Sequence, residues 1–427
     1  MSPLLLTFYG DDFTGSTDAM EALSVNGVPA VLFLAPPTPN DLRRYPDCRA
    51  VGVAGLSRSQ SPAWMDEHLP PVFEALRALG APFCHYKVCS TFDSSPAIGN
   101  IGRAVEIGRR IFGNATVPMI VGAPALRRYV LFGNLFATAD GATHRIDRHP
   151  TMSRHPVTPM GEADLRRHLA QQTALSSAHV DILTLQAGLG LERLQTLRAE
   201  ESAIVLFDTL DAASLREAGR AIWESRPAHP SFLAGSSGVE YALLAHWDLP
   251  ARPKTAPPPP VDRLLVVSGS CSPVTAGQIH WALQNGFHGV ALDPVAMLES
   301  DAEFERAVAA ADAILRNGGS PILYSAAGPA DVVSGKDLGH RLGARLGALA
   351  NRLLRGHELR RVIIAGGDTS GYASQALSIQ ALTLLQPFAP GSPLCRVWSP
   401  DPAMDGREIM LKGGQVGGKA LFVEVRG

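Results

Sequence analysis

Two adjacent carboxylates, Asp11 and Asp12, stand directly after the apolar run Leu4–Tyr9. Carboxylates at the end of a buried strand are costly unless they are solvated, paired or used. One of them could deprotonate or orient a substrate hydroxyl, and the other could bind Mg²⁺. The competing interpretation is a turn with a helix cap, because Asp caps helices, as do Thr14 and Ser16. The residue types leave both interpretations open.

Two basic side chains follow further apolar runs in the first half. Arg58 comes after Ala50–Ala54 among several serines, and Lys87 precedes the hydroxyls of Ser90 and Thr91. A guanidinium can bind a carboxylate through two parallel hydrogen bonds. The alternatives are an ordinary surface arginine and a turn rich in Ser and Thr. The density of polar groups favours a small, hydroxylated anion as the ligand.

Three turns rich in glycine follow apolar runs of the second half. Their candidate phosphate contacts are Ser268, Gly269, Ser270 and Ser272 in the first turn, Gly366, Gly367, Asp368 and Thr369 in the second, and Gly413 and Gly414 in the third. Backbone N–H groups at a helix start favour phosphate. None of the turns matches G-x-G-x-x-G or a P-loop, which argues against a nucleotide-dependent oxidoreductase. Tight turns are the alternative for each, but together they favour a nucleotide site.

A loop near the middle of the chain carries Arg148, His149, Arg154 and His155 between prolines. These side chains could bind an anion or cover the substrate, and the histidines could equally be structural. The spacing of the two histidines is not that of a helical zinc site. We assign no metal ligands from the sequence.

The elements that must position these residues are short apolar runs alternating with amphipathic stretches. This alternation is typical of βαβ units with buried parallel strands. The prolines of Lys254–Pro260 predict an extended linker between two halves. We therefore expect two α/β domains, each with a mainly parallel sheet flanked by helices. Residues 1–250 would form the first domain, 251–260 the linker and 261–427 the second, with the active site in the cleft between the domains.

The composition narrows the class of protein. A net charge of -2 gives no electrostatic footprint for nucleic acid. Five scattered cysteines without C-x-x-C spacing fit a reducing compartment. The N-terminus does not look like a signal peptide, and no apolar run is long enough to span a membrane. The expected location is the cytoplasm.

These motifs, taken together, resemble the four-carbon acid sugar kinase family, which includes D-threonate, D-erythronate and 3-oxo-tetronate kinases. The segments that carry the resemblance are GDDFTGSTDAM, GLSRS, YKVCSTFDSSPAIGNIG, SGSCSPVT, AGGDTSG and LKGGQVGG. Their order and spacing cover nearly the whole chain. The resemblance implies an N-terminal domain for the sugar acid, a C-terminal domain for ATP, and phosphoryl transfer to a terminal hydroxyl.

The resemblance also implies roles for individual residues. The substrate contacts would be Asp12, Arg58, Lys87, Ser90 and Thr91. The ATP contacts would be Ser270, Gly366, Gly367, Asp368, Thr369 and Gly413. One departure stands out, because Cys89 and Asp93 replace an acid and an arginine of the family pattern. Loss of a cation near an anionic substrate should change specificity, so a branched or oxidised acid such as 3-oxo-isoapionate joins the candidates.

We predict an ATP- and Mg²⁺-dependent kinase for a small sugar acid. Asp12 is the first choice for the base and Asp11 the second, while Arg58 or Lys87 would hold the substrate carboxylate. The main alternative is a non-catalytic sensor that binds a sugar acid and a nucleotide without consuming ATP. The expected partners are small molecules, not nucleic acid or membrane. The sequence leaves the oligomeric state open, a homodimer included.

Overall fold

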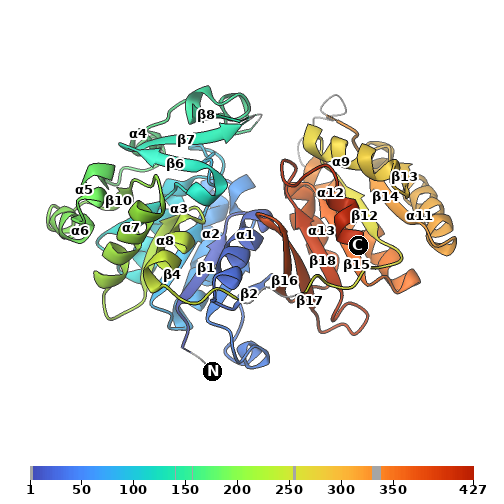
Figure 1. Ribbon diagram of the computed structural model, residues 1–427, viewed down its shortest axis with the longest axis horizontal. Coiled ribbons are helices and arrows are strands. Elements are labelled where there is room, and N and C mark those ends of the chain that lie inside the picture. The colour runs from blue at the N-terminus through green and yellow to red at the C-terminus, as the bar shows by residue number, and fades with distance from the viewer. Residues whose placement is uncertain (1–2, 140, 156, 253–255, 329–337) are drawn as a thin grey trace. The chain divides into compact units, whose positions relative to one another are not determined.

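The computed structural model describes residues 3–139, 141–155, 157–252, 256–328 and 338–427 (Figure 1). The chain divides into two compact units. The first consists of Met1–Asp11, Ala22–Ala30 and Pro36–Arg252, and the second of Asp12–Glu21, Val31–Ala35 and Pro253–Gly427. Residues 253–255 of the predicted linker lie outside the described part of the chain.

The main sheet of the first unit is parallel and has the strand order β3-β1-β4-β11-β5-β10-β9. Its strands are β1 (Leu6–Gly10), β3 (Ala50–Ala54), β4 (Phe83–Lys87), β5 (Val117–Ile120), β9 (Ser177–Val180), β10 (Ile204–Phe207) and β11 (Ser231–Gly235). Gly10 is level with both Ala54 and Lys87, so the chain leaves β1, β3 and β4 at the same edge of the sheet. That edge is where a ligand site of a parallel sheet is expected.

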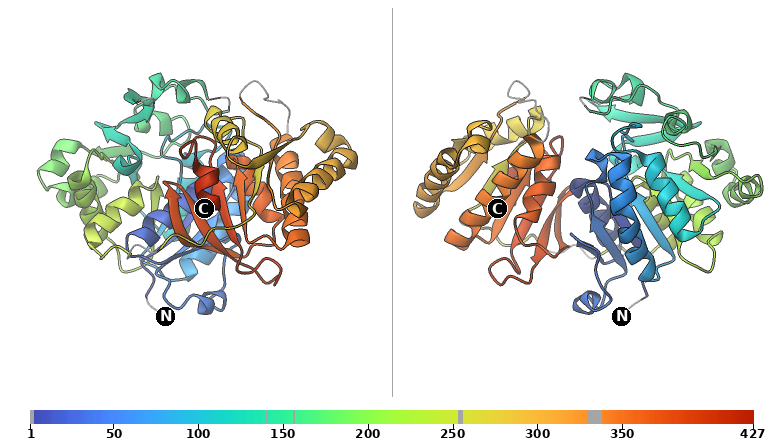
Figure 2. Two further views of the ribbon diagram at one scale, coloured as in Figure 1. Left: turned by 45° about the vertical axis from the view of Figure 1, so that its right-hand side comes forward. Right: turned by 180° about the vertical axis from the view of Figure 1, so that it is seen from behind.

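Helices cover both faces of this sheet (Figures 1 and 2). They are α2 (Pro62–Ala78), α3 (Ile101–Phe112), α4 (Leu165–Leu169), α5 (Ile182–Gln186), α6 (Gly190–Ala199), α7 (Ala212–Glu224) and α8 (Gly238–Trp247), while α1 (Phe13–Val25) is divided between the two units. Side-chain caps fix where some of these helices begin. Ser61 accepts from the Trp64 amide at the start of α2, and Asn100 accepts from the Arg103 amide at the start of α3. Phe73 and Leu69 of α2 belong to the buried core of this unit.

A small antiparallel sheet completes the first unit. Its strands are β6 (Arg128–Leu131), β7 (Asn134–Ala139) and β8 (Ala142–Arg145). Short 3₁₀ turns occupy Asp41–Arg44, Ser57–Ser59, Pro124–Leu126, Ile146–Arg148 and Met152–Arg154. The turn Pro124–Leu126 leads directly into β6, which places Arg128 at the first position of that strand.

The sheet of the second unit is mixed, with the order β13-β14-β12-β15-β18-β17-β16-β2. Its strands are β12 (Leu265–Ser268), β13 (Phe287–Ala291), β14 (Ser320–Tyr324), β15 (Arg361–Ala365), β16 (Ala381–Ala389), β17 (Ser392–Trp398), β18 (Glu408–Lys412) and β2 (Ala30–Phe33). The strands from β13 to β18 in this order are parallel, and β17, β16 and β2 are antiparallel. The expectation of a mainly parallel sheet therefore holds only for one side of this unit.

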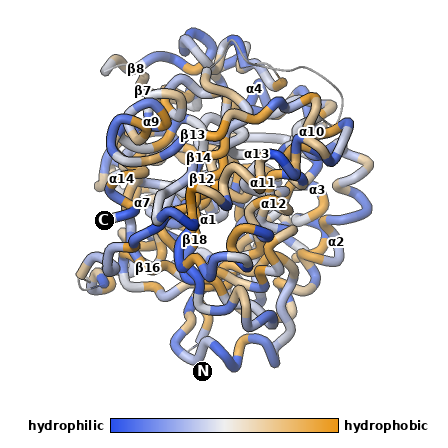
Figure 3. The backbone as a smooth tube through the Cα atoms, turned by 90° about the vertical axis from the view of Figure 1, so that its right-hand side faces the viewer, coloured by the Kyte–Doolittle hydropathy of each residue, from blue (hydrophilic) through white to orange (hydrophobic). Residues whose placement is uncertain are grey.

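The helices of the second unit are α9 (Pro273–Leu283), α10 (Ala296–Glu299), α11 (Asp301–Arg316), α12 (Leu338–His357), α13 (Gly367–Gln375) and α14 (Leu421–Arg426). Figure 3 shows apolar stretches along the central strands β12 and β14. Val266, Ile322 and Ile363 form part of the buried core there. Among the described helices, none combines the length and apolarity that crossing a bilayer requires.

Candidate active site

The strand ends of the first unit bring Asp11, Arg58 and Lys87 together. The Asp11 amide donates to the carbonyl of Lys87 at 2.8 Å, and the Arg58 amide donates to the carbonyl of Asp11 at 3.0 Å. The Arg58 guanidinium lies 4.0 Å from the Asp11 carboxylate through Nε and 3.7 Å from the Asp93 carboxylate through Nη2. Arg58 therefore already has two carboxylates beside it.

The turn after β4 is a compact set of polar groups. The Thr91 hydroxyl donates to Oδ1 of Asp93 at 2.5 Å, and the Cys89 Sγ lies 2.9 Å from Thr91 Oγ1. Burial raises the pKa of the Cys89 thiol, and the charge of Arg58 opposes that rise. Ser90 in the same turn is half-buried. The residue types predicted for substrate contact thus converge on one edge of the sheet.

Lys87 has a more enclosed position than the sequence indicated. Its side chain is 2% exposed, and Nζ donates to the carbonyl of Val88 at 3.0 Å. Lys87 is less suited than a solvent-facing arginine to grip a carboxylate from two sides.

Asp12 has the contacts of a helix cap. Its carboxylate accepts from the Gly15 amide at 2.7 Å and from the Thr14 hydroxyl at 2.9 Å. The side chain is half-buried, whereas that of Asp11 is 4% exposed. The cap does not preclude a chemical role, because a held carboxylate has a fixed direction.

The histidine-bearing loop has contacts of a structural kind. Nδ1 of His149 accepts from the amides of Thr151 and Met152, both at 3.2 Å. Nδ1 of His155 accepts from the Thr158 amide at 3.1 Å. Within the described part of the chain, no three His, Cys, Asp or Glu side chains gather as metal ligands. These contacts favour the structural interpretation of the histidines.

The three glycine turns meet at one edge of the sheet in the second unit. The Gly269 amide donates to the carbonyl of Ala365 at 3.0 Å, and the Gly366 amide donates to the carbonyl of Lys412 at 2.8 Å. The ends of β12, β15 and β18 are thereby held level. Ser272 caps α9 by accepting from the Val274 amide at 3.2 Å. The helices α9 and α13 both start at this edge, and both direct backbone N–H groups toward it.

Close packing explains why two of these positions are glycine. A Cβ on Gly269 would lie 2.3 Å from Oγ1 of Thr369, and one on Gly414 would lie 3.0 Å from Oγ of Ser270. A Cβ on Gly367, in contrast, would meet nothing within 4 Å. The backbone is therefore open at Gly367, where a phosphate could approach. The Asp368 side chain lies outside the described part of the structure.

Lys412 is a residue of this edge that the sequence prediction missed. Its side chain is fully buried, and Nζ donates to Oγ1 of Thr275 at 2.9 Å and to the carbonyls of Gly413 and Gly414 at 2.8 and 3.3 Å. Burial lowers the pKa of Lys412 to about 7. The signal that could have found it is its place directly before two glycines at a strand end.

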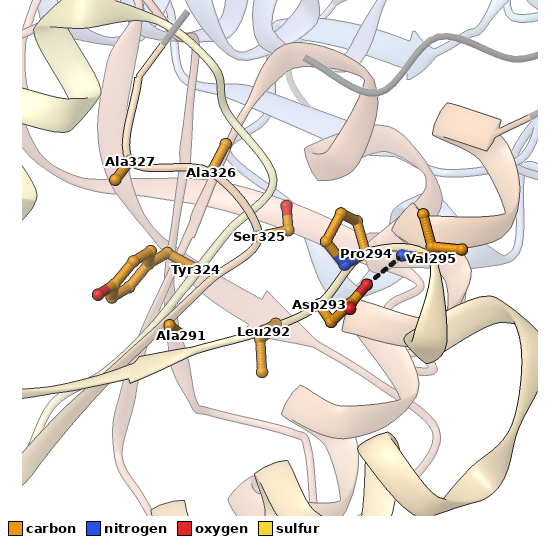
Figure 4. Close-up of a pocket in the computed structure, with 9 residues that line it drawn as sticks. All are labelled: Ala291, Leu292, Asp293, Pro294, Val295, Tyr324, Ser325, Ala326 and Ala327. Carbon is orange, nitrogen blue, oxygen red and sulfur yellow. Dashed lines mark hydrogen bonds between the residues drawn. The ribbon is translucent and has the colours of Figure 1, made fainter. Parts of the chain in front are cut away.

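A pocket of about 460 Å³ opens at the ends of β13 and β14 (Figure 4). Its lining residues are Ala291, Leu292, Asp293, Pro294, Val295, Tyr324, Ser325, Ala326 and Ala327. Asp293 Oδ1 accepts from the Val295 amide at 2.9 Å, which holds one wall of the pocket. The Ser325 amide donates to the carbonyl of Ser268 at 3.0 Å, so the pocket adjoins the first glycine turn.

Two domain models match the chain. A sugar-binding N-terminal domain matches residues 6–243, and a nucleotide-binding C-terminal domain matches residues 265–422. A relative from Paraburkholderia graminis, a 3-oxo-isoapionate kinase, is 51% identical over 99% of this chain and 94% of its own. The chain belongs to the four-carbon acid sugar kinase family. The family predicted from the motifs is confirmed, and this kinase acts on a sugar acid.

Further relatives of the kinase are less similar. The 3-oxo-tetronate kinases of Methylobacterium radiotolerans and Cupriavidus necator are 31% and 30% identical, each over 98% of this chain and 98% and 96% of their own. A crystal structure of a Salmonella typhimurium LT2 protein superimposes with a TM-score of 0.79 at 25% identity, covering 99% and 98% of the two chains. One of a Haemophilus influenzae protein has a TM-score of 0.74 at 21% identity, covers 99% of both chains and shows the same fold.

Proposed function

We propose that this kinase transfers the γ-phosphoryl group of ATP to a terminal hydroxyl of 3-oxo-isoapionate or a closely related sugar acid. The observation that supports this substrate is the 51% identity to a 3-oxo-isoapionate kinase, against 31% or less to 3-oxo-tetronate kinases. The turn Cys89–Asp93 agrees with it, because an altered polar set beside Arg58 should alter the acid that fits.

The first domain would hold the sugar acid at the ends of β1, β3 and β4. Thr91 and Ser90 offer hydroxyls to the sugar, and Asp11 keeps Arg58 in place. Asp12 is our candidate for the group that orients or deprotonates the attacking hydroxyl. Its carboxylate is held by Gly15 and Thr14 and is more exposed than that of Asp11.

The second domain would bind the triphosphate over the glycine turns. The backbone N–H of Gly367 and the start of α13 favour phosphate oxygens, and Lys412 lies beneath the third turn. The hydroxyls of Ser270 and Thr369 lie at the same edge. We place the nucleoside in the pocket at the ends of β13 and β14, which is large enough for a base and ribose.

Mg²⁺ fits this donor set as a companion of ATP. Mg²⁺ usually keeps several water ligands and takes most of its other ligands from the substrate phosphates. The hydroxyls of Ser270 and Thr369 could complete its sphere without a cluster of carboxylates. When bound, Mg²⁺ would offset the negative charge of the phosphates during transfer. Domain closure during the catalytic cycle would then bring hydroxyl and phosphate in line.

A coupled ADP-release assay tests the proposal. The panel is 3-oxo-isoapionate, 3-oxo-tetronate, D-threonate and D-erythronate, each with MgATP. At low substrate concentration, we expect ADP release to be faster with 3-oxo-isoapionate than with any other acid of the panel. A clear preference for D-threonate or 3-oxo-tetronate would refute the proposed substrate.

A further inference from the structure

The turn after β4 that we expect to contact the sugar acid contains a strained residue. Phe92 has a φ of 58°, in the left-handed region that residues with a side chain rarely adopt. Its ring is fully buried, and Thr91 and Asp93 on either side of it share a hydrogen bond of 2.5 Å. A conformation of this kind persists only where the surrounding structure holds it. Contacts from outside the turn must therefore support Phe92.

Three buried side chains form a hydrogen-bonded network against Phe92. The Ser94 hydroxyl donates to the carbonyl of Phe92 at 3.0 Å. Nε2 of Gln172 donates to the same hydroxyl at 2.8 Å, and Nε2 of His168 lies 2.9 Å from it. Because Ser94, His168 and Gln172 are all buried, the loss of one contact would leave a polar group unpaired away from water.

The protons of this network have one consistent arrangement. Oε1 of Gln172 accepts from the Ile101 amide at 2.8 Å, so its NH₂ group faces Ser94. The Ser94 hydroxyl has a single proton, which goes to the carbonyl of Phe92 because a carbonyl can only accept. His168 must then donate from Nε2. Burial lowers the pKa of His168, which keeps the ring neutral with its one proton on that nitrogen.

The ring of His168 also packs against the ring of Phe92. The two rings meet edge to face, with their centroids 5.9 Å apart. His168 thus supports Phe92 twice, directly through its ring and indirectly through the hydroxyl of Ser94. On the other side of Phe92, the carboxylate of Asp93 lies 3.7 Å from Nη2 of Arg58. The position of that carboxylate therefore depends on how Phe92 is held.

We infer that His168 is a positioning residue of the sugar-acid site and that it acts through Ser94 on the turn Cys89–Asp93. This inference rests on the proposed function. The N–H of His168 keeps the Ser94 hydroxyl directed at the carbonyl of Phe92. The turn then presents its polar groups to the acid in one geometry, which a specific site requires. His168 itself is buried behind the turn and does not contact the acid.

Two substitutions separate the N–H of His168 from its ring. His168→Phe keeps an aromatic ring beside Phe92 and removes the N–H, whereas His168→Gln removes the ring and places an amide N–H near the position of Nε2. Ser94→Ala removes the hydroxyl that connects His168 to the turn. His246→Phe is the matched control, because this ring also packs against an aromatic ring, that of Trp223 at 6.4 Å, but in the last turn of α8. The start of α8, not its end, follows the strand end of β11.

Each protein is measured with 3-oxo-isoapionate. Steady-state assays give KM for the acid and for ATP, calorimetry gives Kd for the acid without ATP, and thermal unfolding checks that each variant is folded. We expect His168→Phe and Ser94→Ala to raise KM and Kd for the acid by about tenfold or more, as small displacements in a site do, with KM for ATP unchanged. His168→Gln should bind the acid more tightly than His168→Phe, and His246→Phe should match the wild type.

A double variant tests the route from His168 to the turn. If His168 acts through Ser94, adding His168→Phe to Ser94→Ala should weaken acid binding no further, because members of one hydrogen-bond network are not additive. Multiplied losses would overturn the inference, as would equal acid affinities of His168→Phe and His168→Gln. A merely structural His168 would lower Tm and leave Kd for the acid unchanged. If His168→Phe does not fold, His168→Asn, whose amide is too short to reach Ser94, takes its place in each comparison.

The failures of the two proposals differ. If the wild type binds the acid but does not phosphorylate it, the proposed function fails and the Kd values still decide on His168. If the wild type phosphorylates the acid and the variant without the N–H keeps the wild-type KM and Kd, the inference about His168 is wrong. If the wild type binds no acid in the panel, both are overturned.

Discussion

At the residue scale, the polar side chains of the first domain gather where its strands end. Asp11, Arg58 and Lys87 meet at one edge of the first sheet because Gly10 is level with Ala54 and Lys87. Their pairing could not be predicted, because the distance from Arg58 to Asp93 depends on how the turn after β4 folds back. Neither could the burial of Lys412.

Asp12 allows a substitution that separates capping from chemistry. Asn caps helices as well as Asp does, so Asp12→Asn should keep the start of α1 intact. Loss of the carboxylate should lower kcat by about 10²–10⁴-fold, the range for a positioned base. The measurement is kcat with saturating MgATP and sugar acid, with nucleotide binding by calorimetry as the control. Unchanged kcat would remove Asp12 from the mechanism.

Lys412 predicts a pH dependence of stability. Folding lowers the pKa of Lys412 from 10.5 to about 7, so between those values the unfolded chain binds a proton that the folded chain does not. The stability of the ligand-free kinase should therefore gain a contribution that rises with pH across this window. Lys412→Met removes the titrating group, so the excess Tm of the variant over the wild type should be largest near pH 7 and shrink toward pH 10.

Lys419→Met is the matched control, since Lys419 is exposed in the same segment. Its Tm should follow the wild-type pH profile. If the Tm difference between Lys412→Met and the wild type did not change from pH 7 to 10, the pKa of Lys412 would not be lowered in the folded chain. The Met variant should also bind ATP more weakly, because the turn above it loses two hydrogen bonds and Thr275 of α9 loses one.

At the scale of elements, the alternation of apolar runs and helices predicted the parallel strands of both domains and the turns that follow them. The antiparallel part of the second sheet was harder to foresee. β2 pairs with β16, with Leu32 opposite Leu382. The sequences of two short strands so far apart in the chain do not indicate that they pair with each other. The glycine turns were predicted individually, whereas their mutual contact depends on the level ends of β12, β15 and β18.

Gly269→Ala tests that contact. The new Cβ would lie 2.3 Å from Oγ1 of Thr369, so one of the two turns must shift. Because small misplacements in a phosphate site are costly, KM for ATP should rise by about tenfold or more. Gly277→Ala in α9 is the control, since its Cβ meets nothing within 4 Å, and it should leave KM unchanged. Equal KM values in the two variants would contradict the close packing of the turns.

A buried pair between β4 and α8 carries a stability prediction for the first domain. His85 Nδ1 lies 2.7 Å from Glu240 Oε1, and both side chains are fully buried. Glu240→Ala leaves the histidine without this partner, so the free energy of unfolding, measured in urea, should fall by about 3–5 kcal/mol. Glu200→Ala removes an exposed glutamate beside Arg193 and should cost less than about 1 kcal/mol. Similar losses in the two variants would contradict the role given to the buried pair.

At the scale of the whole molecule, the motif order predicted the family, and two domain models and a 51% identical kinase confirm it. The compact units show a feature that no motif indicated: Asp12–Glu21 and Val31–Ala35 group with the second unit although they precede most of the first. Contacts between such distant segments depend on tertiary packing, which local sequence patterns do not encode. We propose that side chains around the Cys89–Asp93 turn help to set the substrate.

The most direct test of the account is a competition between two acids for one enzyme. Equal amounts of 3-oxo-isoapionate and 3-oxo-tetronate are mixed with MgATP, and the phosphorylated products are counted by mass spectrometry at low conversion, which gives the ratio of kcat/KM values. The account predicts an excess of phosphorylated 3-oxo-isoapionate of at least about tenfold, or 1.4 kcal/mol. An equal yield, or an excess of phosphorylated 3-oxo-tetronate, would contradict it.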